Sequence, residues 1–244
     1  MASTTTTTFL AILLVVAASA APARSCSPRD IHALLSVKQA LGNPASLSTW
    51  TPASPNCCAW DLSSNRLTGG IPAAFADLPS LRSLDLRHNQ LTGPIPAGLV
   101  QGQFRSLVLS YNQLTGPIPR DDARDEINTV DLSHNRLTGD PSHLFAAGRP
   151  IGKVDLSWNY LNFDLSRLVF PPELTYLDLS HNLIRGTVPL SLERLSTLQK
   201  LDLSYNRLCG PLPKGHGVIK HGCKPYAHNQ CSKGTPLAGC QDLE

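Results

Sequence analysis

Apolar and polar positions along this chain follow one pattern that recurs at a nearly constant interval. In six of seven copies, apolar residues stand eight, five and three positions before an asparagine. The last two of these alternate with polar residues, which is the periodicity of a strand with one buried face. The asparagines that mark the copies are Asn65, Asn89, Asn112, Asn135, Asn159, Asn182 and Asn206.

An interval this short and regular is typical of a solenoid, because one unit is too small to bury its own apolar side and stacks on its neighbours. The pattern is that of a leucine-rich repeat. It predicts an α/β fold: a right-handed solenoid with a concave parallel sheet, a convex side of 3-10 and extended segments, a helical N-terminal cap and disulfide-bonded caps. We expect the asparagines to bond backbone groups in the turn after each strand, rather than to form a functional row.

The residues after each asparagine support this interpretation. Four copies read Asn-x-Leu-Thr-Gly, and four copies continue to Ile-Pro or Val-Pro. Glycine permits a turn with positive φ, and proline stiffens extended chain, so we place these residues on the convex side. The fourth and fifth copies depart from the pattern, at residues 139–145 and 161–171.

Residues 1–23 predict a secretory signal peptide. The apolar run at residues 9–20 is too short to span a bilayer, and small residues at Ala20 and Ala23 suit cleavage. No later apolar run is long enough to cross a membrane. We therefore expect a soluble, extracellular product without a membrane anchor.

Residues 24–60 predict an N-terminal cap, 61–208 the repeats and 209–244 a C-terminal cap. Within the first cap a helix is expected to begin with Ser27 as N-cap and Pro28 at its first position, and to end at Gly42. Trp50 is expected to anchor the core. The predicted apolar face of the helix comprises Ile31, Leu34, Leu35 and Leu41.

Seven cysteines flank the repeats and none lies within them, which suits an oxidising compartment where disulfides hold the ends of a solenoid. A zinc site made by the last four cysteines with His216, His221 and His228 is the weaker interpretation, because the cysteine spacings lack a C-x-x-C pair. No metal and no cofactor are expected. The disulfide candidates are Cys26, Cys57, Cys209, Cys223, Cys231 and Cys240.

No catalytic motif stands out: the sequence has no nucleophile elbow, phosphate loop or metal-spaced cluster, so an enzyme is not expected. A binding module is the positive prediction, because each repeat contributes one residue to each column of a concave sheet. Aspartates lie four positions before most of the asparagines, and aromatic residues or histidines directly before them. The simpler explanation is that aspartate is only the consensus of the repeat. The candidate partner-binding residues are Arg82, Asp85, His88, Arg105, Tyr111, Asp131, His134, Lys153, Asp155, Trp158, Tyr176, Asp178, His181, Lys200, Asp202 and Tyr205.

No nucleic-acid partner is expected. Basic residues do gather near the C-terminal cap, where no acid lies between Asp202 and Asp242. A solvated end cap is the simpler explanation, and attraction to acidic wall polysaccharide such as pectin is the alternative. The basic residues are Arg207, Lys214, Lys220, Lys224 and Lys233.

The irregular copies carry a more specific resemblance. The segment 163–166 with Phe170-Pro171 and the Leu-Thr-Tyr-Leu-Asp-Leu run at 174–179, preceded by residues 139–145, resembles the polygalacturonase-inhibiting proteins of plant cell walls. Cys57-Cys58-Ala59-Trp60 also fits that family. The resemblance implies pairing of Cys26 with Cys57 and leaves Cys58 without its partner, because the chain lacks the family's first few repeats after Trp60.

This resemblance implies an extracellular inhibitor of pathogen polygalacturonases, fungal or insect, that acts in the plant cell wall or apoplast and docks its concave face over the substrate cleft of the enzyme. A repeat-only recognition protein that binds a peptide or a receptor ectodomain, in development or defence signalling, is one alternative. A truncated copy with little inhibitory activity is another.

Overall fold

The computed structural model describes residues 28–42, 44–47, 59–78, 81–100, 104–120, 127–146 and 148–229. The predicted signal peptide, Ser27, Trp50 and five of the seven cysteines, Cys58 among them, lie outside these residues. None of the helices in the described part is both long and apolar enough to cross a membrane.

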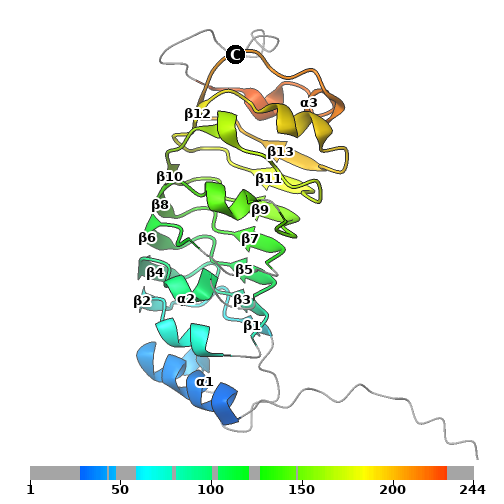
Figure 1. Ribbon diagram of the computed structural model, residues 1–244. Coiled ribbons are helices and arrows are strands. Elements are labelled where there is room, and N and C mark those ends of the chain that lie inside the picture. The colour runs from blue at the N-terminus through cyan, green and yellow to red at the C-terminus, as the bar shows by residue number, and fades with distance from the viewer. Residues whose placement is uncertain are drawn as a thin grey trace, which may run out of the picture.

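The repeats form a solenoid whose inner wall is one parallel sheet of seven strands (Figure 1). Each strand contributes three residues, and neighbouring strands pair at equivalent positions of successive repeats, so that Leu84 lies beside Leu107 and Val130 beside Val154. These central residues are buried, which confirms the predicted strand pattern. In spatial order the strands are β1 (Ala59–Asp61), β3 (Ser83–Asp85), β5 (Ser106–Val108), β7 (Thr129–Asp131), β9 (Lys153–Asp155), β11 (Tyr176–Asp178) and β13 (Lys200–Asp202).

A second parallel sheet, which the sequence pattern did not predict, follows the turn after each inner strand. A single Thr-Gly segment predicts a turn or irregular chain on the convex side. The segments of successive repeats lie side by side, however, and pair as parallel strands. Five strands form this sheet: β2 (Thr68–Gly70), β4 (Gln90–Gly93), β6 (Gln113–Pro117), β8 (Arg136–Gly139) and β10 (Tyr160–Leu161). A separate pair comprises β12 (Arg185–Gly186) and β14 (Arg207–Leu208).

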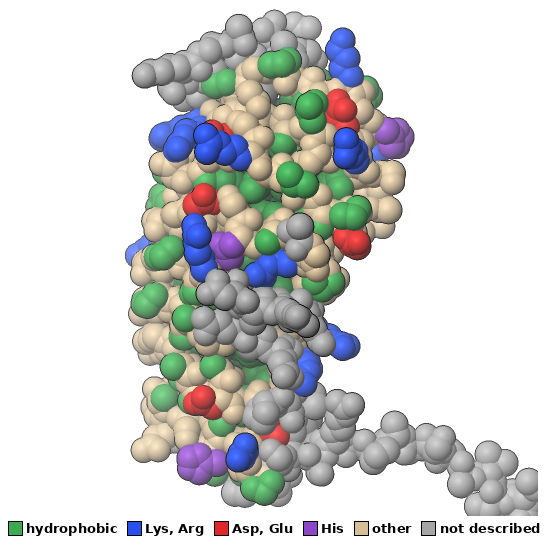
Figure 2. Space-filling model, in the orientation of Figure 1, with side chains coloured by type: hydrophobic (Ala, Val, Ile, Leu, Met, Phe, Trp, Pro, Cys, Tyr) green, Lys and Arg blue, Asp and Glu red, His purple; other side chains and the backbone are tan. Residues whose placement is uncertain are grey.

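Short helical turns on the outer side connect the two sheets, as predicted. Figure 2 shows this side of the molecule, where hydrophobic and charged side chains are interspersed. The 3-10 turns are η2 (Ala73–Asp77), η3 (Ser142–Phe145), η4 (Leu165–Arg167) and η5 (Leu190–Arg194), with α2 (Ala97–Val100) in the second repeat. The leucines, isoleucines and valines of all turns form one continuous core between the layers.

The N-terminal cap contains η1 (Ala45–Leu47) and α1 (Pro28–Ala40), which packs against η2 at the end of the solenoid. The helix is confirmed, but part of its predicted apolar face is wrong: Leu35 is exposed and Ile31 and Leu41 are only half-buried. The buried positions follow the i, i+3, i+4, i+7 spacing from a fully buried aspartate, which places Leu35 off the contact side. These positions are Asp30, Ala33, Leu34 and Val37.

The C-terminal cap holds α3 (His216–Ile219), which packs on η5, and η6 (Lys224–Tyr226), which lies beside β13. Cys209 and Cys223 both form disulfides. Two of the four thiolates of the zinc alternative are therefore unavailable to a metal, and the described residues contain no group of three or more metal-ligating side chains.

Candidate functional site on the concave sheet

The repeated asparagines have the structural role that the sequence predicts. From Asn89 to Asn206, each is buried at the turn after its strand and joins its own repeat to the preceding one, whereas the half-buried Asn65 bonds, among the described residues, only within its own turn. The Asn159 side-chain carbonyl accepts from the Leu137 backbone N–H at 2.9 Å, and its amide donates to the Leu132, Leu156 and Ser157 carbonyls at 3.0–3.2 Å. These bonds fix the turn, so the residue before the asparagine takes the same conformation in every repeat.

That preceding residue has a positive φ of 53–56° in every turn, a left-handed conformation that is unusual for bulky side chains. It holds the side chains in register and stacks the rings of seven successive turns face to face. We call this stack the ring ladder; it comprises His88, Tyr111, His134, Trp158, His181, Tyr205 and His228.

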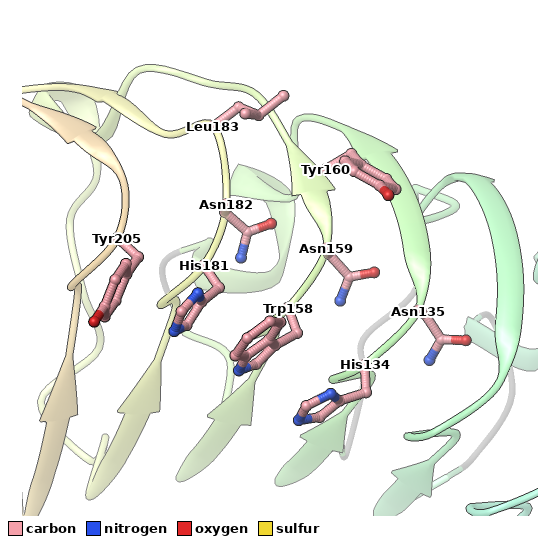
Figure 3. A pocket seen from close by; sticks show the side chains of 9 residues that line it. All are labelled: His134, Asn135, Trp158, Asn159, Tyr160, His181, Asn182, Leu183 and Tyr205. Carbon is pink, nitrogen blue, oxygen red and sulfur yellow. The ribbon is translucent and has the colours of Figure 1, made fainter. Parts of the chain in front are cut away.

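Ring centroids in the ladder lie 3.7–5.3 Å apart, with interplanar angles of 12–21°. Figure 3 shows four of the rings side by side just beyond the ends of successive strands. Neighbouring rings cover one another's faces, so the solvent-exposed parts are ring edges and their polar atoms. Trp158 remains 50% exposed, the largest fraction among the exposed apolar side chains of the ladder.

A column of aspartates runs along the inner strands beside the ring ladder. We call the following residues the aspartate column: Asp61, Asp85, Asp131, Asp155, Asp178 and Asp202. In four of the repeats, a serine two positions further along donates both its hydroxyl and its backbone N–H to the same carboxylate oxygen, with hydroxyl distances of 2.6–2.8 Å. The carboxylates are therefore held in fixed orientations before any partner arrives.

Burial and mutual repulsion perturb the middle of this column. Burial raises the pKa of Asp155, and the charges of Asp178 and Asp131 raise it further. Burial also raises the pKa of Asp178, although hydrogen bonds from Ser180 oppose the shift. These carboxylates therefore retain protons at a higher pH than exposed aspartates do.

Three other residues predicted for the binding surface, Lys153, Tyr176 and Lys200, lie beside the aspartate column. The Tyr176 hydroxyl donates to Asp155 Oδ2 at 3.1 Å, and Lys153 Nζ lies 4.7 Å from the centre of the Tyr176 ring. Lys200 Nζ lies 3.3 Å from Asp202 Oδ2 and 3.7 Å from Asp178 Oδ2. Because burial raises the pKa of Tyr176 and neighbouring aspartates add to the effect, its phenol remains protonated and acts as a donor.

At the N-terminal end of the sheet the surface is more basic. Arg82 and Arg105 immediately precede β3 and β5, and Arg87 forms an ion pair of 2.7 Å with Asp85. Burial raises the pKa of Asp85, while Arg87 lowers it. The predicted residues thus form one inner surface, with its acidic part between β7 and β13.

A groove with a volume of about 560 Å³ lies beside the ring ladder (Figure 3). Tyr160 and Leu183, which were not predicted as site residues, lie across the groove from the rings; Tyr160 is 55% exposed. The buried amides between the two sides are Asn135, Asn159 and Asn182.

The seventh ring of the ladder, His228, was also missed. It belongs to an eighth asparagine turn: the Asn229 side-chain carbonyl accepts from Leu208 N–H at 3.0 Å, and its amide donates to the Leu203 carbonyl at 3.1 Å. Asn229 follows Asn206 at the same interval that separates Asn182 from Asn159, which was the available signal. The turn lacks the preceding leucines, because His221, Lys224 and Tyr226 stand eight, five and three positions before Asn229.

The comparisons with known proteins agree with this architecture. A model described as leucine rich repeat matches residues 59–91 and 164–208, and one described as leucine rich repeat N-terminal domain matches residues 27–62. The ectodomain of the Arabidopsis thaliana receptor kinase GASSHO1/SCHENGEN3, solved in complex with CASPARIAN STRIP INTEGRITY FACTOR 2, is 28% identical with a TM-score of 0.60. The similarity covers 74% of this chain and 22% of the receptor chain. Fold and matches together define a leucine-rich-repeat protein with the N-terminal cap of that class.

Two relatives define the family more closely. "Polygalacturonase inhibitor 1" of Oryza sativa subsp. japonica is 56% identical, over 91% of this chain and 94% of the relative. "Polygalacturonase inhibitor 2" of Arabidopsis thaliana is 42% identical, over 42% of this chain and 31% of the relative. The chain belongs to the polygalacturonase inhibitor family.

The rice alignment also shows a difference in length. It spans 312 residues, although the whole of this chain has only 244 residues and 91% of them are aligned. The alignment therefore contains positions of the relative, together as long as several repeats, that have no counterpart here. This agrees with the missing repeats that the sequence resemblance implies.

Proposed function

We propose that this protein is a secreted inhibitor of polygalacturonases, fungal or insect, that acts in plant defence at the cell wall and binds its target through the concave sheet. Family membership carries the proposal. The inner surface supports it, because exposed ring edges and oriented carboxylates lie together on one rigid sheet. The role requires binding and no catalytic chemistry of its own.

The chemistry of the target explains why an acidic surface suits this role. Polygalacturonate is a polyanion, so an enzyme that binds it needs a positively charged cleft. Carboxylates of the aspartate column are separated by about 4.8 Å, the spacing of neighbouring strands, and could occupy such a cleft in place of substrate. The basic residues in and next to the C-terminal cap, Arg207, Lys214, Lys220 and Lys224, are the surface that would attract pectin itself.

The primary test is inhibition of a polygalacturonase by the secreted, oxidised protein, with binding measured in parallel. Inhibition together with binding supports the proposal. Binding without inhibition would indicate the truncated copy with little activity, for which the shorter repeat array is the supporting observation.

Trp158→Ala is expected to weaken polygalacturonase binding by at least about 1–2 kcal/mol, because the substitution removes a half-exposed ring and leaves a gap in the ring ladder. Calorimetric titration at neutral pH measures the change. Thr115→Ala is the control, since Thr115 is exposed on β6 of the second sheet, and it should bind like the wild type. Equal affinity of Trp158→Ala and the wild type would exclude this part of the concave sheet as the interface.

A repeat-only recognition protein is the second candidate. The similarity to a receptor ectodomain that was solved in complex with a second molecule favours it, because the same solenoid architecture serves recognition there. Pull-down with plant receptor ectodomains and secreted peptides distinguishes the two functions: capture of such a ligand without any polygalacturonase binding would favour this second candidate.

A further inference from the structure

The ring ladder separates its titratable rings from one another. Histidines and neutral aromatic rings alternate over all seven positions, so no histidine stacks directly on another. His134 lies between Tyr111 and Trp158, and His181 lies between Trp158 and Tyr205. The ladder therefore contains four titratable imidazoles, each with at least one neutral aromatic face against it.

This arrangement tolerates protonation of several imidazoles at once. The faces of tyrosine and tryptophan attract a cation placed over them. Successive histidines are two strand spacings apart, about 10 Å, which is close to the Debye length at about 0.1 M salt, so their mutual repulsion is weak. Stacking thus separates the charges while it holds the rings in place.

The groups that face the ladder come from the inner strands. Burial lowers the pKa of His181; the charge of Asp202 raises it, whereas His134 and His228 lower it. Protonation of His181 therefore requires a lower pH than protonation of an exposed histidine does. The charged and titratable groups on these strands or directly after them are Asp61, Asp85, Arg87, Asp131, Lys153, Asp155, Tyr176, Asp178, Lys200 and Asp202.

We propose that the ring ladder makes the concave surface responsive to pH, so that acidification weakens its attraction for a basic partner. From β7 to the C-terminal cap, the inner surface carries four aspartates and two lysines, a formal charge of −2. Protonation of His134, His181 and His228 would change that charge to +1. The proposal rests on the proposed function, because it concerns regulation of the same surface.

The expected direction follows from the ordinary pKa of histidine, about 6.5. As the pH falls from about 7 to about 5, imidazolium forms beside the carboxylates, and affinity for a Lys/Arg-rich partner should fall by about tenfold or more at low ionic strength. Protonation of the aspartates with raised pKa, Asp155 and Asp178, acts in the same direction. The experiment must therefore separate the histidines from the aspartates.

A fourfold variant, which combines His88→Tyr, His134→Tyr, His181→Tyr and His228→Tyr, makes that separation. Tyrosine already occupies this turn with the same φ at Tyr111 and Tyr205, so the ladder should persist without its titratable rings. His32→Tyr, on the exposed side of α1, is the matched control. A double variant, His134→Tyr with His181→Tyr, serves if the fourfold variant does not fold.

Affinity for octalysine and for a polygalacturonase is measured at pH 7 and pH 5. We expect the wild type and His32→Tyr to lose about tenfold or more on acidification, and the ladder variant to lose less than about threefold. A ladder variant as pH-dependent as the wild type overturns the proposal, as does a wild type that does not bind octalysine at pH 7. If octalysine shows the expected pattern but polygalacturonase binds at neither pH, the proposed function fails while the pH response stands.

Discussion

Replacing Asn159 by alanine is expected to lower the free energy of unfolding by about 3–5 kcal/mol. The buried Leu137 N–H would lose its acceptor, and an unpaired buried donor alone costs about 1–3 kcal/mol. The Leu132, Leu156 and Ser157 carbonyls would each lose one donor. Each of these carbonyls keeps a second donor, so the cost for each carbonyl is smaller than the cost for the Leu137 N–H. These costs add to that of the unpaired N–H.

Asn65→Ala is a matched control for that experiment, because Asn65 occupies the same position in the first repeat. Its amide donates to the Leu62 and Ser63 carbonyls within its own turn, and no bond from Asn65 to a preceding repeat occurs among the described residues. We expect this substitution to cost about 1–2 kcal/mol. Denaturant unfolding measures both values, and equal costs would contradict the role of the asparagine in joining repeats.

Leu156→Ala is expected to cost about 2–5 kcal/mol, because it opens a cavity in the middle of the core. Leu156 is fully buried, and its backbone joins two repeats: its N–H donates to the Asp178 carbonyl, and its own carbonyl accepts from Asn159 of the same repeat and from Asn182 of the next. Each repeat contacts only its neighbours, so protection from hydrogen exchange should fall first in β7, β9 and β11.

The same chemical change at Leu190 provides the comparison, since this leucine is 71% exposed on the outer side. Leu190→Ala should change the free energy of unfolding by less than about 0.5 kcal/mol. Hydrogen exchange that is equally protected along the whole solenoid in Leu156→Ala and in the wild type would show that the repeats do not unfold locally.

The inner strands and the asparagine turns were predictable because their signals are local and repeated seven times. Alternation of Leu177 and Leu179 with polar neighbours defines a half-buried strand within a short stretch of sequence. An asparagine that recurs directly after such a strand has few roles other than pairing the backbone of the turn. The columns of the candidate site follow from the same register, so aspartates, lysines and rings could be assigned to one surface.

The second sheet and the stacking of the rings could not be predicted in the same way. Thr92 favours a strand but Gly93 disfavours one, and the segment forms a strand because similar segments lie on either side of it. Ring stacking depends on the positive φ of each turn, which composition does not reveal. The buried face of α1 was predicted wrongly because the helix buries Asp30. An aspartate is not counted among the apolar positions from which a helix face is predicted.

The first inner strand joins the second with the register found everywhere else: Ala59 lies beside Ser83, and Asn89 donates to the Leu62 carbonyl as later asparagines do to their own preceding turns. Because every junction is alike, whole turns can be lost from such a chain without changing how the remaining ones pair. Each turn adds about 4.8 Å to the wall, so the loss of three or four would shorten it by about 14–19 Å. A shorter wall reaches across less of a partner's surface, and so fewer residues must distinguish one target enzyme from another.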